Sequence, residues 1–291
     1  MIFNHKKIII IFGKGPATKN ALISAEQILN KNFELYYFYF ERENYEFDNL
    51  PTCRNLKIKE FKINSYEEFK QKVFSLSPIF IVLTQCSLII KEDLINFMGS
   101  NIINLHHGNL PKYRGMGPIT NAILEGEKYF GITIHIVEEK IDTGRILYQK
   151  NFNISGLTNE EVYNLCIKSG KKLLINLFEK INLSNELISF KQDESVATYF
   201  SGKALNYKKP IINFEQNAEK IMCFCRAYYF PSKNLFPLIQ INSKLYYSKY
   251  LPEIGLITKD KNIIKLNEKE KILEIACKDK LLIFREIQIK N

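Results

Sequence analysis

The first two hundred residues alternate between short apolar runs and longer stretches in which apolar side chains recur at helical spacing. Short apolar runs rich in β-branched and aromatic residues are typical of buried strands. The runs predicted as strands are Lys7–Phe12, Phe33–Phe40, Leu56–Ile63, Pro78–Thr84 and Ile102–Leu105. The stretches predicted as helices are Ala17–Asn30, Tyr66–Phe74 and Lys91–Met98. This alternation indicates βαβ units and a mainly parallel sheet.

The same alternation continues further along the chain. Ile119–Gly126 predicts a short helix that ends in glycine, whereas Gly131–Val137 and Arg145–Ile154 predict strands. Thr158 opens the pattern Thr-Asn-Glu-Glu, a capping box, in front of a long helix to about Ile181. We therefore expect an α/β fold with a Rossmann-like, mainly parallel sheet and flanking helices. In such sheets ligands bind outside the carboxyl ends of the strands.

The pattern changes after the long helix. From Ser184 to Pro210 the chain is polar and without periodicity, which indicates a connection between domains. Phe214–Tyr228 then predicts a helix that Phe230-Pro231 ends. The runs predicted as strands beyond it are Leu238–Ile241, Leu245–Lys249, Ile263–Leu266, Ile272–Ala276 and Leu281–Ile289. Short, evenly spaced strands indicate a small β-rich (OB-like) barrel. We expect a first domain over residues 1–200 and a second over residues 201–291.

Composition narrows the class of protein. With 291 residues and 46% hydrophobic content, the chain is long enough to bury one or two cores. No apolar run approaches the roughly 18 residues of a membrane span, and Ile8–Phe12 is too short for the core of a secretory signal. Six scattered cysteines without Cys-x-x-Cys spacing indicate a reduced, cytoplasmic protein without a metal site.

The formal charge of +10 leaves two interpretations open. A basic chain suits a nucleic-acid or phosphate partner. Lysine is abundant, dispersed and mixed with asparagine and isoleucine, whereas arginine is scarce. A composition bias of the source genome therefore explains the charge slightly better than a binding surface, which would favour clustered arginines.

Asn104 and His106 lie where a buried strand is expected to end. Alternation along the strand sends both side chains to the same side of the sheet. Taken alone, the pair is better explained by ordinary turn and structural hydrogen bonds. Asp142 changes that balance, because it lies in a loop after another strand and its carboxylate can fix the tautomer of His106. We expect His135 to be a packed side chain, and we assign no chemistry to His107.

A set of short motifs occurs in order over roughly residues 100–150. The set comprises Asn104-x-His106, Leu110-Pro111-Lys112-Tyr113-Arg114-Gly115, Pro118, Ala122-Ile123, Gly126, Gly131-Ile132-Thr133-Ile134-His135 and Asp142-Thr143-Gly144-x-Ile146-Leu147. As an ordered set it resembles the signature of the folate-dependent formyltransferases. The resemblance implies transfer of a formyl group from N10-formyltetrahydrofolate, as co-substrate, to a substrate amine through a tetrahedral intermediate, without a metal.

The resemblance also implies roles for individual residues. In the catalytic trio, Asn104 would donate from its amide to the developing oxyanion, His106 would add a donor or take the amine proton, and Asp142 would orient His106 and help pass the proton on. The implied folate-binding residues are Gln85, Ser87, Leu88, Ile89, Ile141 and Gly144. The implied substrate-binding residues are Gly13, Lys14, Tyr113, Arg114 and Gly117. For the Gly13-Lys14 turn, which is not part of a GxGxxG fingerprint, a simple tight turn is an equal alternative.

The acceptor stays open between two branches of this family. Methionyl-tRNA formyltransferases usually carry His-x-Ser-Leu-Leu-Pro, and the His-His-Gly variant at residues 106–108 looks more like the sugar N-formyltransferases. Arg226 and Arg285 are few for a tRNA-binding groove. We expect a nucleotide-linked amino deoxysugar used in surface polysaccharide (lipopolysaccharide) synthesis, with methionyl-tRNA as the alternative. A non-catalytic folate- or RNA-binding protein is the alternative of another class. A homodimer is a possible assembly, and no membrane partner is expected.

Overall fold

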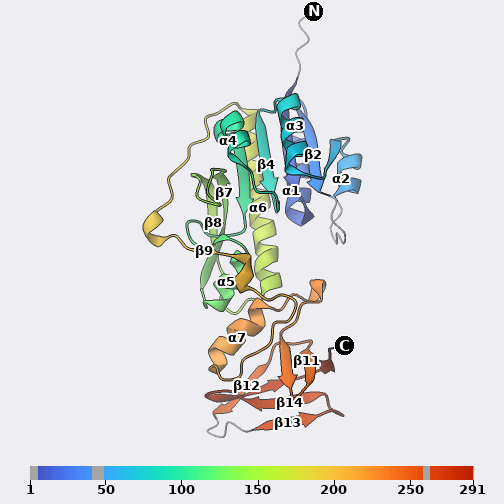
Figure 1. Cartoon of the computed structure of the whole chain (residues 1–291), viewed down its shortest axis with the longest axis vertical. Coiled ribbons are helices and arrows are strands. Elements are labelled where there is room, and N and C mark those ends of the chain that lie inside the picture. The colour runs from blue at the N-terminus through green and yellow to red at the C-terminus, as the bar shows by residue number, and fades with distance from the viewer. Residues whose placement is uncertain (1–5, 41–48, 258–262, 291) are drawn as a thin grey trace, which may run out of the picture. The chain divides into compact units, whose positions relative to one another are not determined.

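The computed structural model describes residues 6–40, 49–257 and 263–290 (Figure 1). The main sheet of its first part is built from β1 (Lys7–Gly13), β2 (Phe33–Phe40), β3 (Lys59–Ile63), β4 (Phe80–Thr84), β5 (Ile102–His106), β7 (Tyr129–Ile136) and β8 (Ile146–Asn153). They form one sheet in the order β3-β2-β1-β4-β5-β7-β8. Strands β1 to β5 pair in parallel, and β7 runs antiparallel to β5. The sequence prediction of an α/β fold with a mainly parallel sheet is confirmed.

Helices alternate with these strands along the chain. They are α1 (Gly15–Leu29), α2 (Leu50–Asn55), α3 (Tyr66–Leu76), α4 (Glu92–Met98), α5 (Pro118–Leu124) and α6 (Asn159–Asn182). Phe69 of α3 and Leu94 of α4 pack on apolar side chains of β1, β2 and β4 in one core cluster. Consecutive residues Ile9, Ile10 and Ile11 of β1 are fully buried, as expected for a parallel strand covered on both faces. The core thus lies in layers above and below the sheet.

The order of the strands determines where a ligand can bind. Strand β1 lies between β2 and β4, so the chain first builds the sheet in one direction and then continues from β1 in the other. The loops that leave the carboxyl ends of β1 and β4 therefore diverge, and a crevice forms at such a switch point. The motif residues at the ends of β1, β4 and β5 all belong to this edge of the sheet.

The capping box before α6 forms as predicted. The backbone N–H of Thr158 donates to Glu161 Oε2 at 2.8 Å, and the Glu161 N–H donates to Thr158 Oγ1 at 3.4 Å. This reciprocal pair satisfies amides that the first helical turn leaves without partners.

The C-terminal part consists of a helix and two antiparallel sheets. Its elements are α7 (Ala218–Ala227), β10 (Leu238–Ile241), β11 (Lys244–Ser248), β12 (Glu253–Ile257), β13 (Ile264–Asn267), β14 (Ile272–Ala276), β15 (Lys280–Phe284) and β16 (Ile287–Ile289). One sheet has the order β10-β11-β16 and the other β12-β15-β14-β13. A separate core of buried side chains, including Ile239, Leu273 and Phe284, holds them together. The predicted β-rich C-terminal part is confirmed.

Three predicted boundaries were wrong for local reasons. The strand predicted over Leu56–Ile63 begins only at Lys59, because Leu56 caps α2 and Lys57 has a φ of 55°. The strand predicted over Leu281–Ile289 is two strands, since Glu286 takes a φ of 51° between them. The helix predicted from Phe214 begins at Ala218, because the Asn217 side chain accepts from Lys220 N and so caps it.

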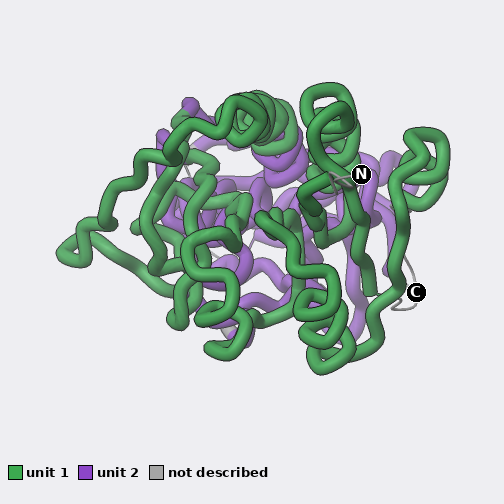
Figure 2. Tube along the Cα trace, turned by 90° about the horizontal axis from the view of Figure 1, so that it is seen from above, with its two compact units in different colours: residues 1–114, 131–151, 165–199 green, residues 115–130, 152–164, 200–291 purple. Residues whose placement is uncertain are grey.

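The chain divides into two compact units (Figure 2). Unit 1 comprises residues 1–114, 131–151 and 165–199, and unit 2 comprises residues 115–130, 152–164 and 200–291. The predicted division between residues 200 and 201 remains a prediction, because unit 2 also takes in α5 and the residues that open α6. Within the described part of the chain, no helix is both long enough and apolar enough to cross a membrane.

Candidate active site

The end of β5 brings Asn104 and His106 to one face of the sheet. In the antiparallel pairing with β7, Asn104 lies opposite His135 and His106 lies opposite Thr133. Residues that lie opposite each other on neighbouring strands point to the same face. His106 and His135 are 7% and 2% exposed, so the cluster is largely withdrawn from water.

His106 is held from both sides of its ring. Its Nε2 lies 2.9 Å from the backbone oxygen of Tyr113, and its Nδ1 lies 3.5 Å from Asp142 Oδ2. A carbonyl oxygen only accepts, so Nε2 carries the hydrogen and Nδ1 faces the carboxylate. The predicted approach of Asp142 to His106 is therefore present in the geometry.

His135 is also part of this cluster, although the sequence favoured a packing role. Its Nδ1–H donates to the Ile136 oxygen at 2.8 Å, and its Nε2 accepts from Asn104 Nδ2 at 3.1 Å. The same Nε2 lies 3.3 Å from Asp142 Oδ1. The signal that could have found His135 is the strand register, because an antiparallel partner of β5 must place one of its side chains beside Asn104.

Asp142 thus meets a basic ring nitrogen with each of its two oxygens. Both imidazoles already use their assigned N–H on backbone oxygens, so two neutral rings would turn lone pairs toward the carboxylate. Lone pairs and an ionised carboxylate repel each other at these distances. A proton placed between Asp142 and one of these ring nitrogens would relieve the repulsion, so the arrangement suits proton transfer.

The pKa of His106 follows from the same surroundings. Burial lowers it from the usual value of 6.5 and is the largest cause, the Asp142 carboxylate raises it, and His135 lowers it. The unfolded chain therefore takes up a proton near pH 6.5 that the folded chain resists. This contribution to stability is present above that pH and is lost as the pH falls.

We expect the thermal midpoint of the protein to fall between pH 7.5 and 5.5, and to fall less in a His106→Gln variant. Glutamine keeps a polar group of similar reach but does not titrate. Calorimetry of both proteins at the two pH values measures the difference. Equal falls in the two proteins would show that His106 does not carry this dependence.

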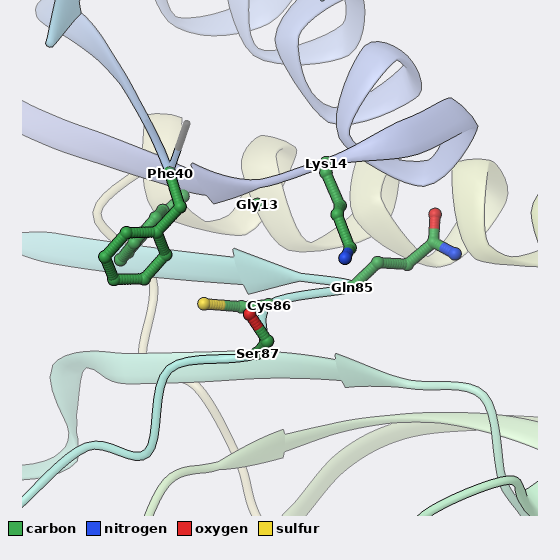
Figure 3. A pocket seen from close by; sticks show the side chains of 7 residues that line it. Gly13, Lys14, Phe40, Gln85, Cys86 and Ser87 are labelled. Atoms are coloured by element: carbon green, nitrogen blue, oxygen red, sulfur yellow. The ribbon is translucent and has the colours of Figure 1, made fainter. Parts of the chain in front are cut away.

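A small pocket lies at the carboxyl ends of β1 and β4 (Figure 3). Its lining includes Phe12, Gly13, Lys14, Phe40, Gln85, Cys86 and Ser87. Lys14 extends from the end of β1 toward the loop that follows β4 (Figure 3). A Cβ at Gly13 would lie 1.7 Å from the Thr84 oxygen, so only glycine lets β1 and β4 approach this closely. The predicted residues Gly13, Lys14, Gln85 and Ser87 thus occupy one pocket.

Three of the predicted contact residues have partners inside the chain, and their binding roles remain predictions. Gln85 Oε1 accepts from Ala17 N at 3.3 Å, at the start of α1. The Tyr113 side chain is 2% exposed, so its contribution to the cluster is its backbone oxygen. The Arg114 guanidinium, also buried, binds Gln192 and Glu194.

The remaining predicted residues differ in exposure. Leu88 packs partly against the core of unit 1, whereas Ile89 is 64% exposed and Ile141 is 42% exposed. A Cβ at Gly144 would lie 1.8 Å from the Ile136 oxygen, so the loop that carries Asp142 touches the end of β7. Gly117 lies in unit 2, where it precedes α5 with a φ of 64°.

Within the ranges that the structure describes, no group of three or more His, Cys, Asp or Glu side chains could hold a metal ion. The chemistry of the cluster described above is that of an amide, two imidazoles and a carboxylate. It can donate to an oxyanion and exchange a proton.

Comparisons with known proteins show the family to which the chain belongs. Residues 38–178 match the formyl transferase model, and residues 205–291 match the formyl transferase C-terminal domain. The methionyl-tRNA formyltransferase of Thermodesulfovibrio yellowstonii is 31% identical over 233 residues, which cover 78% of this chain and 71% of that protein. The chain therefore belongs to the formyl transferase family, as its motifs predicted, and it is an N-formyltransferase.

Two solved structures resemble the whole chain in fold. The N-formyltransferase from Helicobacter canadensis, in complex with folinic acid and dTDP-3-aminofucose, has a TM-score of 0.76 at 21% identity and covers 98% of this chain and 100% of its own. The methionyl-tRNA formyltransferase from Clostridium thermocellum has a TM-score of 0.59 at 19% identity, with 98% and 99% covered.

Proposed function

We propose that the protein transfers a formyl group from N10-formyltetrahydrofolate to the amine of a nucleotide-linked amino deoxysugar, for surface polysaccharide synthesis. The observation that carries the acceptor class is the full-length agreement in fold with an N-formyltransferase solved with dTDP-3-aminofucose, at a TM-score of 0.76. The tRNA enzyme of similar coverage agrees less well, at 0.59.

Asn104, His106 and Asp142 carry the reaction in this proposal. One N–H of the Asn104 amide is used on His135, and the second is available to the oxygen that becomes negative during attack. The proton that the amine loses is taken up by the facing atoms His106 Nδ1 and Asp142 Oδ2, which then share it. The same pair then returns a proton to the departing nitrogen, so that the cluster ends each cycle as it began.

The folate site has support from the exposed side chains near the predicted loops. Ile89 and Ile141 are large apolar residues that remain 64% and 42% exposed, and both lie in segments that the resemblance assigns to folate. A flat heterocycle buries such side chains and takes its polar contacts from backbone groups of an irregular loop. The segment after β4 has no regular secondary structure between Gln85 and Lys91, so its backbone groups are suited to this role.

The pocket at the ends of β1 and β4 is our candidate for the anionic part of the acceptor. Lys14 supplies a positive charge there, immediately before α1 begins at Gly15. Phosphate groups bind favourably beside a lysine ammonium. Ser87, which the resemblance assigns to folate, also lines this pocket.

Methionyl-tRNA is the second candidate acceptor, favoured by the 31% identity to an enzyme of that name. Against it stands the pairing of Arg285, whose Nε and Nη2 donate to the Glu253 carboxylate at 2.7 and 3.2 Å. A guanidinium engaged with a carboxylate contributes less to a phosphate-binding surface. This removes one of the two arginines on which a tRNA-binding barrel would depend.

The test is to incubate the protein with N10-formyltetrahydrofolate and a panel of nucleotide-linked 3-amino and 4-amino deoxysugars, beside charged initiator methionyl-tRNA. We expect the mass of one formyl group to be added to a sugar nucleotide. Addition to the tRNA-borne methionine alone would replace the proposed acceptor by the second candidate. Addition to neither, with the donor intact, would overturn both.

A further inference from the structure

The side-chain amide of Gln192 uses all of its hydrogen-bonding positions. Its Nε2 donates to the backbone oxygens of Asp142 and Gly144, at 2.8 and 2.7 Å. Its Oε1 accepts from Arg114 Nε and Nη2, at 3.1 and 2.8 Å. An amide has two N–H donors and two lone pairs on oxygen, so this group is fully satisfied.

Gln192 belongs to a segment that was expected only to connect two domains. Residues 189–198 instead run beside the site. Phe190 exchanges backbone hydrogen bonds with Ile146 at 2.8 and 2.9 Å, and Thr198 Oγ1 accepts from Tyr113 N at 2.8 Å. The 189–198 segment is therefore attached to unit 1 at both of its ends, with Gln192 between them.

We propose that Gln192 is a positioning residue that holds the Asp142 loop in register with His106. The proposal rests on the roles proposed above for His106 and Asp142. Asp142 has a φ of 56°, a left-handed backbone conformation that is uncommon for residues other than glycine. Two hydrogen bonds to carbonyl oxygens on either side of the next residue hold that conformation in place. Displacement of the loop would move the carboxylate away from His106 Nδ1.

One dipeptide connects both halves of the His106–Asp142 pair. The oxygen of Tyr113 accepts from His106, and the guanidinium of Arg114 holds Gln192, which holds the Asp142 loop. Arg114 is itself fixed by Glu194, with Nη1 and Nη2 donating to the carboxylate at 2.9 and 2.6 Å. The adjacent residues Tyr113 and Arg114 thus position His106 and the Asp142 loop, respectively.

The chemistry of this link is specific to glutamine. Glutamate has the same shape and accepts from Arg114 equally well, but its carboxylate has no N–H for the oxygens of Asp142 and Gly144. Methionine fills a similar volume and makes neither contact. The two substitutions therefore separate the donors of Gln192 from its pairing with Arg114.

The experiment compares Gln192→Glu and Gln192→Met with the wild type in the full-length protein. The acceptor is whichever one the wild type formylates, so an incorrect acceptor assignment leaves this test intact. We expect kcat to fall about 10- to 100-fold in both variants, with KM changed less than threefold, because misplacement of a catalytic group by about 1 Å costs rate rather than binding. Titration with a stable folate analogue gives the folded, active fraction of each preparation.

Two comparisons distinguish positioning from general stabilisation. Ser189→Ala removes the hydrogen bond from Arg145 Nε to Ser189 Oγ in the same segment without touching Gln192, and it should keep wild-type kcat. In an Asp142→Asn background, Gln192→Met should lower kcat less than threefold further, since its effect passes through Asp142. Wild-type kcat in Gln192→Glu, or a full independent loss in the double variant, would overturn the proposal.

Discussion

Replacing Asp142 by asparagine is expected to lower kcat for formyl transfer by about 10²- to 10⁴-fold, the range attributed to a positioned acid or base. Asparagine keeps the shape of the side chain and removes its charge and its capacity for a proton. The amide can donate to one of the two ring nitrogens, of His106 or His135, while its oxygen turns toward the lone pair of the other. Neither orientation restores the shared proton.

Single-turnover rates with saturating donor measure this effect. Binding of a folate analogue should change little, because the proposed folate contacts of the loop are the Ile141 side chain and backbone groups, and not the Asp142 carboxylate. The thermal midpoint should stay near that of the wild type. The hydrogen bonds from Gln192 to the backbone oxygens of Asp142 and Gly144 do not involve the carboxylate and are kept in the variant. A kcat within threefold of the wild type would remove Asp142 from the proposed trio.

The sequence predicted the elements that place Asn104 and His106, for simple reasons. A buried parallel strand is a continuous apolar run, and the polar residues that follow it mark its carboxyl end. Alternation then puts the two side chains on one face without knowledge of the partner strand. Asp142 was added because it lies in a loop after another strand, and the motif order supported it, although no local pattern connects it to His106.

Other members of the site depend on contacts that a local pattern does not contain. His135 joins Asn104 through the register of β5 with β7. Gln192 meets the loop of Asp142 from 50 residues away, inside a segment whose polar composition resembles an ordinary linker. The pairing of the buried Arg114 guanidinium with Gln192 and Glu194 likewise has no signature in the sequence.

In the C-terminal sheets, too, strands marked by their own residues were predicted, and a strand that depends on a distant partner was missed. Strand β14 was predicted with its observed ends because it is apolar and bounded by polar turns. Strand β12 was missed, since Glu253–Ile257 contains a central Gly255 and pairs with β15 through an irregular register. Glycine lowers the strand propensity of this segment, and the strand forms because it pairs with β15.

Gly144→Ala is expected to disable the enzyme through backbone geometry alone. The added methyl carbon would lie 1.8 Å from the Ile136 oxygen and 2.8 Å from its carbonyl carbon. Neither atom belongs to a flexible side chain, so the loop must move away from the end of β7. Gln192 binds the Gly144 oxygen and the Asp142 oxygen together, so the displaced loop carries Asp142 with it. We expect kcat to fall at least about 10²-fold, and stability to fall by about 1–3 kcal/mol, as for an overpacked site.

The matched control is Gly156→Ala, at a glycine whose φ is 76° and whose added Cβ would meet nothing within 4 Å. This variant is expected to lose about 1 kcal/mol of stability from backbone strain while keeping wild-type kcat. Denaturant unfolding and single-turnover kinetics on both variants separate the two effects. If activity follows stability alone, the two glycine variants should lose activity in proportion to their loss of stability. A Gly144→Ala protein that is destabilised like the control yet fully active would show that Asp142 does not need the loop in its present place.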